Sequence, residues 1–420
     1  MNIVIVGAGI GGLTLALMLE RVGLAKDLRV YEAARELKPL GVGINMQPHA
    51  VQELDYLGLV PALRATSVEA KEFAFFTARG QHVYSEPCGL YAGYGVPHFS
   101  VHRGDLQQVL FDAVCERLGE NAVVCGHRCA GVEQDADGSD VRFVDPAGLT
   151  LPTVRGDIVI AADGIHSAVR KQLYPNEGRP LFHGINMWRG VTRHPPFLTG
   201  ASVTRIGGLN TTGKIVVYPV RNDVDGAGNQ LINWNTEVVT DVASEVDWNG
   251  AGRLEDFMPI FEHWRYDWLD VAQLIRDTEF ILSFPMVDRD PVDRYAFGRV
   301  ALMGDAAHPM YPRGGNGGAQ AIIDARAISD ALLALPPVAA LAEYDRIRVP
   351  FVSEIVRQNR TAPPDIIIDT VERLTGGARF ENIADVIDPA ELARMSLAYK
   401  QLVRSDLESV GTADAVKGSS

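Results

Sequence analysis

Three acidic residues are candidates for ligand binding, because each follows a short apolar, β-branched run of the kind that forms a buried strand. They are Glu32, Asp163 and Asp305. A carboxylate in such a place can accept hydrogen bonds from the hydroxyl groups of a ligand. Taken singly, each is more often a turn residue or a helix N-cap. They therefore carry a prediction only in combination with the glycine-rich turns beside them.

The first glycine-rich turn, Gly7–Gly12, follows an apolar run and opens a run of helix formers. In a strand–turn–helix unit, Gly7 allows the tight turn, Gly9 lets a pyrophosphate approach the backbone, and Gly12 lets helix and strand pack closely. Glu32 comes twenty residues later, where an acidic side chain accepts hydrogen bonds from an adenosine ribose. This unit predicts a dinucleotide site, but it does not distinguish FAD from NAD.

The second glycine-rich turn, residues 311–318, follows Gly304 and Asp305 and opens another helix-forming run. Its backbone N–H groups and the helix dipole favour an anion, which for a flavin would be the N1–C2=O region of the reduced ring. His308 is a candidate general base, with packing beneath this turn as the alternative. His166 and Ser167 are expected to cap or brace a helix.

Composition narrows the class of protein. The net charge of −14 argues against nucleic acid and anionic membranes as partners. Four cysteines in 420 residues do not make a disulfide framework and favour free thiols in the cytoplasm. The uncharged first nineteen residues lack a basic start and a cleavage pattern, so we expect no export.

The ordered motifs, over roughly residues 1–360, resemble the aromatic-ring flavoprotein hydroxylases, the p-hydroxybenzoate hydroxylase group. Residues 102–107 resemble the arginine-bearing helix start of that group. The resemblance implies an α/β (α+β) protein with a Rossmann-like FAD-binding domain of the glutathione reductase type. That domain would comprise residues 1–70, 98–180 and 286–360. An inserted β-sheet substrate domain would comprise 71–97 and 181–285, and C-terminal helices with a frayed tail would occupy 361–420.

The residues expected to bind FAD follow from the motifs and the resemblance. They are Gly7, Gly9, Gly12, Glu32, Ala33, Val42, Gly43, Arg103, Gln107, Cys129, Asp163, Gly164, Gly304, Asp305, Pro312, Gly315, Asn316, Gly317, Gly318 and Ala319. Residues 41–43 lack the arginine that many members of the group carry there, and Gly318 stands where a bulkier residue is common. Both departures bear on how freely the flavin ring moves. No metal site is expected.

Four aromatic side chains are candidates to line a substrate pocket. They are Trp188, Tyr218, Trp234 and Tyr311, with core packing as the alternative for each. Arg189 and Arg313 are candidates to pair with a substrate carboxylate, with surface solvation as the alternative.

The reaction is implied by the resemblance. NADH or NADPH would bind transiently and reduce FAD, and O₂ would give a C4a-hydroperoxide that hydroxylates a small aromatic or N-heteroaromatic ring. The cofactor carries this chemistry, and the protein orients the reactants and excludes water. Residues 40–48, 187–192 and 284–291 resemble the branch of 5-methylphenazine-1-carboxylate 1-monooxygenases, so decarboxylation can accompany hydroxylation.

Two other functions stay open. Baeyer–Villiger insertion or epoxidation could arise from the same fold, and a carrier of the GDP-dissociation-inhibitor kind would use the fold without catalysis. The sequence permits a monomer or a homodimer. Towards the C-terminus, residues 338–358 are expected to form one or two helices, broken or kinked at Pro350.

Overall fold

The structure is a computed structural model that describes residues 1–38, 41–240, 252–361 and 366–410. Residues 411–420, expected to form a frayed tail, lie outside the described residues. In the described chain, no helix is both long and apolar enough to cross a membrane.

A six-stranded sheet forms the first half of the fold, in the order β20-β21-β12-β1-β2-β8. Its strands are β20 (Ala296–Phe297), β21 (Val300–Leu302), β12 (Ile158–Ala161), β1 (Asn2–Val6), β2 (Asp27–Tyr31) and β8 (Val123–Val124). All neighbours are parallel except β20 and β21. The central strands β1 and β12 are buried on both faces, which explains their continuous apolar sequence.

Helices cover this sheet. α1 (Ile10–Arg21) packs against α8 (Asn316–Ala334) and α4 (Arg103–Leu118), and the shorter helices α2 (Pro48–Tyr56) and α3 (Val60–Thr66) pack beside them. The short helix α5 (Ala168–Leu173) contacts strand β9 instead. Helix α1 starts very close to the end of β1, and only a glycine fits at position 12. A Cβ there would lie 2.0 Å from the Gly7 carbonyl oxygen. Gly7 itself has a φ of +103°, a conformation that favours glycine.

A seven-stranded sheet forms the second half, in the order β19-β13-β16-β15-β14-β5-β6. It combines β5 (Glu72–Phe76) and β6 (His82–Pro87) with β13 (Leu181–His194), β14 (Ser202–Ile206), β15 (Lys214–Arg221), β16 (Gln230–Val239) and β19 (Leu282–Asp288). The neighbours are antiparallel except β5 and β14. The small helices α6 (Met258–Phe261) and α7 (Val271–Arg276), with the ribbon β17 (Arg265–Tyr266) and β18 (Leu269–Asp270), pack on its outer face.

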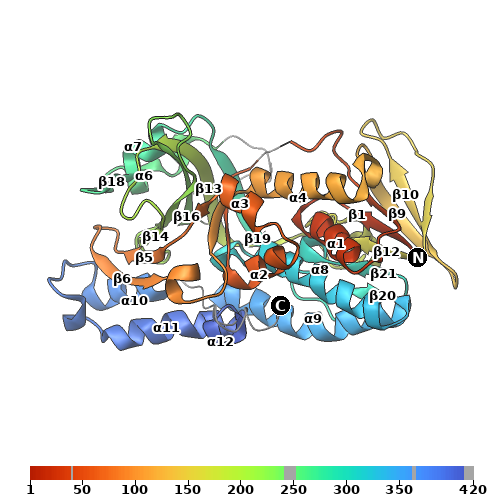
Figure 1. Ribbon diagram of the computed structural model, residues 1–420. Helices are drawn as coiled ribbons and strands as arrows, with labels where there is room; N and C mark the ends of the chain where they lie inside the picture. Colours follow the sequence, from red (N-terminus) through yellow and green to blue (C-terminus); the bar gives the residue numbers. More distant parts are fainter. Residues whose placement is uncertain (39–40, 241–251, 362–365, 411–420) are drawn as a thin grey trace.

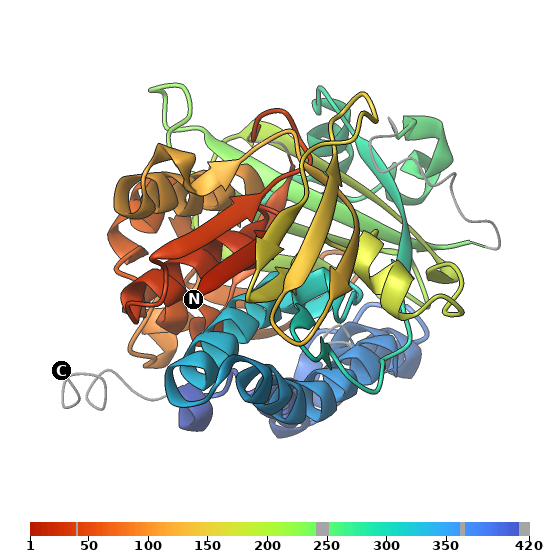
Figure 2. The ribbon, with the colours of Figure 1, turned by 90° about the vertical axis from the view of Figure 1, so that its right-hand side faces the viewer.

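Two three-stranded sheets contain most of the remaining strands. β3 (Gly43–Met46), β7 (Phe99–His102) and β4 (Val68–Glu69) lie between the large sheets, and β9 (Arg128–Gln134), β10 (Ser139–Val144) and β11 (Val154–Gly156) form an antiparallel meander. Figure 1 shows the six-stranded sheet at one end of the molecule and the seven-stranded sheet at the other. In Figure 2 the meander lies in front of the six-stranded sheet.

The C-terminal helices α9 (Pro337–Thr361), α10 (Ile366–Thr375), α11 (Pro389–Leu402) and α12 (Leu407–Val410) run along one side of both large sheets (Figures 1 and 2). Of the alternatives expected for this stretch, the structure has a single helix, because α9 continues through Pro350 without a break. A proline inside a helix costs about 3 kcal/mol. Buried residues on both sides of it, including Tyr344 and Val352, anchor the helix and offset that cost.

Candidate active site

Three strand ends bring the glycine and acidic motifs together. Val6 pairs with Ala161, and Ala161 pairs with Leu302, so β1, β12 and β21 end side by side. Ligands of parallel sheets bind at the carboxyl ends of the strands. The turns that carry Gly7, Asp163 and Gly304 therefore share one edge of the sheet.

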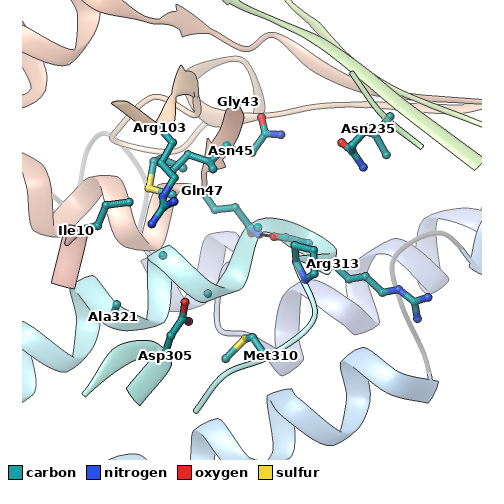
Figure 3. Close-up of a pocket in the computed structure, with 18 of the residues that line it drawn as sticks. Ile10, Gly43, Asn45, Gln47, Arg103, Asn235, Asp305, Met310, Arg313 and Ala321 are labelled. Carbon is teal, nitrogen blue, oxygen red and sulfur yellow. Dashed lines mark hydrogen bonds between the residues drawn. The ribbon is translucent and has the colours of Figure 1, made fainter. Parts of the chain in front are cut away.

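A cavity of about 610 Å³ extends from this edge to the inner face of the seven-stranded sheet. Figure 3 shows Ile10 and Asp305 on one side of it and Asn235 on the other. The predicted cofactor residues that line it are Gly9, Gly43, Arg103, Asp163, Gly164, Gly304, Asp305, Pro312, Gly315, Gly317 and Gly318.

The strand-edge end of the cavity fits an extended dinucleotide. A Cβ placed on Gly9 would meet no atom of the described chain within 4 Å, so the backbone there is open to a ligand. Asp163 Oδ2 accepts a hydrogen bond from Ala168 N at 2.9 Å, whereas Oδ1 is buried and has no partner among the described residues. Burial also raises the pKa of Asp163. A hydroxyl group of the cofactor could donate the hydrogen bond that Asp163 Oδ1 lacks.

The second glycine-rich turn ends at the start of α8. Gly315 has a φ of +69° and precedes the helix, and Gly317 and Gly318 line the cavity from its first turn. A Cβ on Gly317 would have Asp305 Oδ1 as its nearest neighbour, at 3.7 Å. Unbonded N–H groups and the helix dipole therefore face the cavity beside Asp305.

The remaining predicted cofactor residues lie outside the cavity lining in the described structure. They are Gly7, Gly12, Glu32, Ala33, Val42, Gln107, Cys129, Asn316 and Ala319. Several of them shape the first turn: the Glu32 carboxylate accepts hydrogen bonds from Ala8 N and Ala34 N, both at 2.8 Å, and Gln107 Nε2 donates to Ala8 O at 2.8 Å. A carboxylate has further lone pairs, so Glu32 can still accept from a ribose.

His308 lies beneath the second turn, outside the cavity lining as far as the described residues go. Its Nε2 is 2.6 Å from Asp324 Oδ2, and both side chains are buried. The same carboxylate accepts hydrogen bonds from Gly304 N at 2.9 Å and Arg348 Nε at 2.7 Å. These hydrogen bonds hold the turn in place. His308 therefore packs beneath the turn, which was the alternative to a role as general base.

Ser167 and His166 differ in position. Ser167 caps α5, since its Oγ accepts a hydrogen bond from Arg170 N at 2.9 Å, as expected. His166 instead lines the cavity. Burial lowers its pKa.

The seven-stranded sheet presents every second residue to the cavity. Lys214, Val216 and Tyr218 of β15 line it, as do Asn235 and Glu237 of β16. In β13 the inward residues are Met187 and Arg189, which pair with Glu237 and Asn235. Lys214 Nζ and Glu237 Oε1 form a buried ion pair at 2.5 Å in this inner face.

Trp188 and Trp234 are not brought to the cavity. They stand on the opposite face of the sheet, in the apolar cluster under α6 and α7. Trp234 Nε1 donates to Thr278 Oγ1 at 2.8 Å, and Phe257 stacks on Trp188 with ring centroids 4.9 Å apart. For these two residues the expectation of a pocket position is therefore corrected to core packing.

The two tyrosines also separate. Tyr218 lines the cavity, and burial raises its pKa to about 12, against the lowering effect of Arg189. The phenol therefore stays protonated at neutral pH. Tyr311 lines instead a second cavity, which lies between the start of β13 and α10.

Arg189 and Arg313 both line the first cavity, and the alternative of surface solvation is wrong. Arg189 Nη2 donates to Gly43 O at 2.7 Å, and Arg313 is 4% exposed. Arg189 Nε and Arg313 Nε and Nη2 have no hydrogen-bond acceptor within the described chain. Buried guanidinium atoms of this kind fit an anionic ligand group.

Several cavity residues were missed from the sequence. Asn45 and Gln47 of the β3 region line it, and Gln47 Nε2 donates to Gly314 O. His98 also lines it, and burial lowers its pKa to about 3. Tyr399 and Lys400 reach it from α11. Their stretch carries ordinary amphipathic helix spacing, so no local signal marks them.

Known proteins resemble this chain over most of its length. The family described as FAD binding domain matches residues 1–246 and 273–359. Phenazine 1,6-dicarboxylic acid hydroxylase of Lysobacter antibioticus is 39% identical over 410 residues, which cover 96% of this chain and 97% of that protein. The 3-amino-4-hydroxybenzoate 2-monooxygenase of Streptomyces cremeus is 31% identical and covers 93% of this chain and 94% of its own.

A solved structure is also similar. Klebsiella pneumoniae HpxO, complexed with FAD and uric acid, superimposes with a TM-score of 0.71 at 25% identity. The match covers 99% of this chain and 97% of that one.

Proposed function

The chain belongs to the FAD binding domain family, and on that premise we propose that it hydroxylates a carboxylated N-heteroaromatic ring with NADH or NADPH as electron donor. Its fold, its FAD cofactor and its class, a flavin monooxygenase acting on aromatic small molecules, are as expected from the sequence. A carrier without catalysis is set aside, because relatives along the whole chain are hydroxylases and monooxygenases.

The observation that carries the substrate proposal is the cationic inner face of the cavity. Arg189 and Arg313 reach it with guanidinium atoms that lack acceptors among the described residues. Arg205 lies on the same face, whereas Lys214 there is paired with Glu237. The chain as a whole carries a net charge of −14, so this local excess of cations needs an explanation. A ring carboxylate supplies the missing acceptors.

The protein's contribution is to bind, orient and exclude water. FAD, when bound along Gly9, Asp163 and the start of α8, supplies the reduction and oxygen activation that side chains cannot. Tyr218 keeps its proton and donates a hydrogen bond to the substrate. Met187 and Phe284 of the inner lining keep the ring in an apolar, water-poor space.

The division of the chain follows from the same proposal. We assign residues 1–70, 98–180 and 286–360 to FAD binding and residues 71–97 and 181–285 to the substrate. The seven strands of the second sheet, within residues 72–87 and 181–288, support this division. The four free thiols favour the cytoplasm, and we propose a monomer or a homodimer there.

The test is a spectroscopic and product assay. The purified protein is examined for flavin absorbance, and NADH and NADPH oxidation is followed with phenazine-1-carboxylate, phenazine-1,6-dicarboxylate and unsubstituted phenazine. Label from ¹⁸O₂ should appear in a hydroxylated product of the carboxylated rings. A colourless protein that FAD cannot reconstitute, or an ester formed from a ketone substrate, would contradict the proposal.

A matched variant tests the carboxylate contact. Arg189→Met should raise the Kd of phenazine-1-carboxylate by about 10- to 100-fold, because a charge-assisted hydrogen bond contributes roughly 1.5–3 kcal/mol. The Kd of unsubstituted phenazine and the FAD content should stay unchanged. An equal loss for both ligands would show that Arg189 supports β3 rather than the carboxylate.

A further inference from the structure

A second cavity, of about 920 Å³, lies between the start of β13, the loop after β14 and helix α10. Its outer residues are exposed, among them Ile366 and Arg373. Its inner residues are buried, including Ile185, Leu209 and Tyr311. The cavity therefore leads from solvent into the protein.

The wall between the two cavities is a small apolar cluster. Ile185, Leu209 and Tyr311 line the second cavity, whereas Met187 and Met286 of the same cluster line the first. Methionine side chains are flexible and repack readily. This wall can therefore yield without a change in the backbone.

Arg313 lines both cavities. It donates one hydrogen bond, from Nη1 to Asn359 O at 3.1 Å, and its Nε lies 3.6 Å from Glu237 Oε2. Its Nε and Nη2, like the buried Tyr311 hydroxyl, have no hydrogen-bond partner in the described part of the chain. In Figure 3 its side chain extends away from Asp305. A buried cation held this loosely is suited to receive an anion from either side.

Bound FAD would restrict how a substrate can enter the first cavity. Bound FAD would occupy the end at Gly9 and Asp163, which closes that end to a substrate. At the other end the inner face is buried, with Lys214 1% and Tyr218 3% exposed.

We propose that the second cavity is the route by which the anionic aromatic substrate reaches the active site, with Arg313 taking its carboxylate at the wall. The lining carries three arginines, Arg313, Arg360 and Arg373, and two carboxylates, Asp369 and Glu372, so its cations outnumber its anions in a chain that is otherwise negative. This inference rests on the proposed function.

The experiment measures association of phenazine-1-carboxylate with the holoenzyme by stopped-flow, using the change in flavin absorbance. Thr370 on α10 lines the second cavity, and Leu374 on the same helix is 55% exposed and outside the lining residues described. Thr370→Trp should lower the association and dissociation rate constants together, by about tenfold, and leave Kd within about twofold. Leu374→Trp should change neither.

A second pair of variants tests the charge at the rim. Arg373→Gln should slow association about two- to threefold at low salt, and the difference should fade above roughly 0.15 M ionic strength. Arg379→Gln makes the same change in net charge at an exposed residue outside the described lining, and should leave association unchanged.

The outcomes separate the route from the function. Equal association in Thr370→Trp and Leu374→Trp would overturn the route while the proposed function stands. A higher Kd with unchanged association would identify a binding subsite and overturn the route as well. No flavin response to the probe in the unaltered holoenzyme would overturn the proposed substrate class and the route with it.

Discussion

His308 and Asp324 form a buried pair, with Nε2 2.6 Å from Oδ2, directly beneath the turn that carries Asp305. Asp324 also accepts a hydrogen bond from Gly304 N. The carboxylate thus ties α8 to the end of β21. This turn lines the FAD end of the cavity. The His308–Asp324 pair therefore supports the cofactor site and does not transfer a proton in the reaction.

Loss of His308 should weaken cofactor binding and not the chemical step. His308→Ala removes the hydrogen bond to Asp324, and the Kd of FAD should rise about tenfold. His308→Gln keeps a donor and should restore most of the affinity. With FAD saturating, both variants should hydroxylate at near-normal rates in rapid-quench assays. A general base would instead show a loss of about 10²–10⁴ in rate with FAD affinity intact.

The same pair predicts how stability depends on pH. Burial raises the pKa of Asp324, but His308 and Arg348 outweigh it and lower the pKa from 3.8 to about 2. A carboxyl whose folded pKa lies below its unfolded value stabilises the protein above the unfolded pKa. Urea unfolding should show wild type more stable than Asp324→Asn above pH 4. That difference should shrink as the pH falls from about 4 to about 2, and a constant difference would contradict the assignment.

Gly9 and Gly12 should separate binding from folding. Gly12→Ala places a Cβ 2.0 Å from Gly7 O, so the variant should melt at a lower temperature even without FAD. Gly9→Ala meets no described atom within 4 Å and should leave the melting temperature of the apoprotein unchanged. Its FAD occupancy should fall, because the added methyl enters the space reserved for the pyrophosphate. Calorimetry and flavin absorbance measure the two effects, and normal occupancy in Gly9→Ala would place the cofactor elsewhere.

Trp234 and Tyr218 should respond in opposite ways. Trp234→Phe loses the hydrogen bond to Thr278 Oγ1 and leaves a void, at a cost of about 1–3 kcal/mol in the free energy of unfolding. The Kd of the substrate should not change. Tyr218→Phe should instead raise that Kd with little loss of stability. Because the pKa of Tyr218 is raised to about 12, the wild-type rate should show no alkaline limb from this phenol below pH 10. A limb that disappears in Tyr218→Phe would contradict this.

The sequence by itself determined the local units. Gly7–Gly12 with its flanking strand and helix, the turn at Asp163, and Gly304–Gly318 before α8 are each encoded by contiguous residues. Strand, turn and helix propensities act within a few residues, so these units can be recognised without the tertiary structure. Their order along the chain was enough for the resemblance to FAD-dependent hydroxylases.

The tertiary structure alone decided which side chains face the cavity. β15 is buried on both faces, so no alternation of polar and apolar residues distinguishes Val216 from Val217. The sequence therefore placed Trp188 and Trp234 in the pocket. Only their packing in the apolar cluster under α6 and α7 shows that they lie on the opposite face of the sheet. Tyr399 comes from a helix almost four hundred residues beyond the first turn, and its position depends on long-range packing. Such packing is set by contacts between distant segments, which periodicity within a segment does not encode.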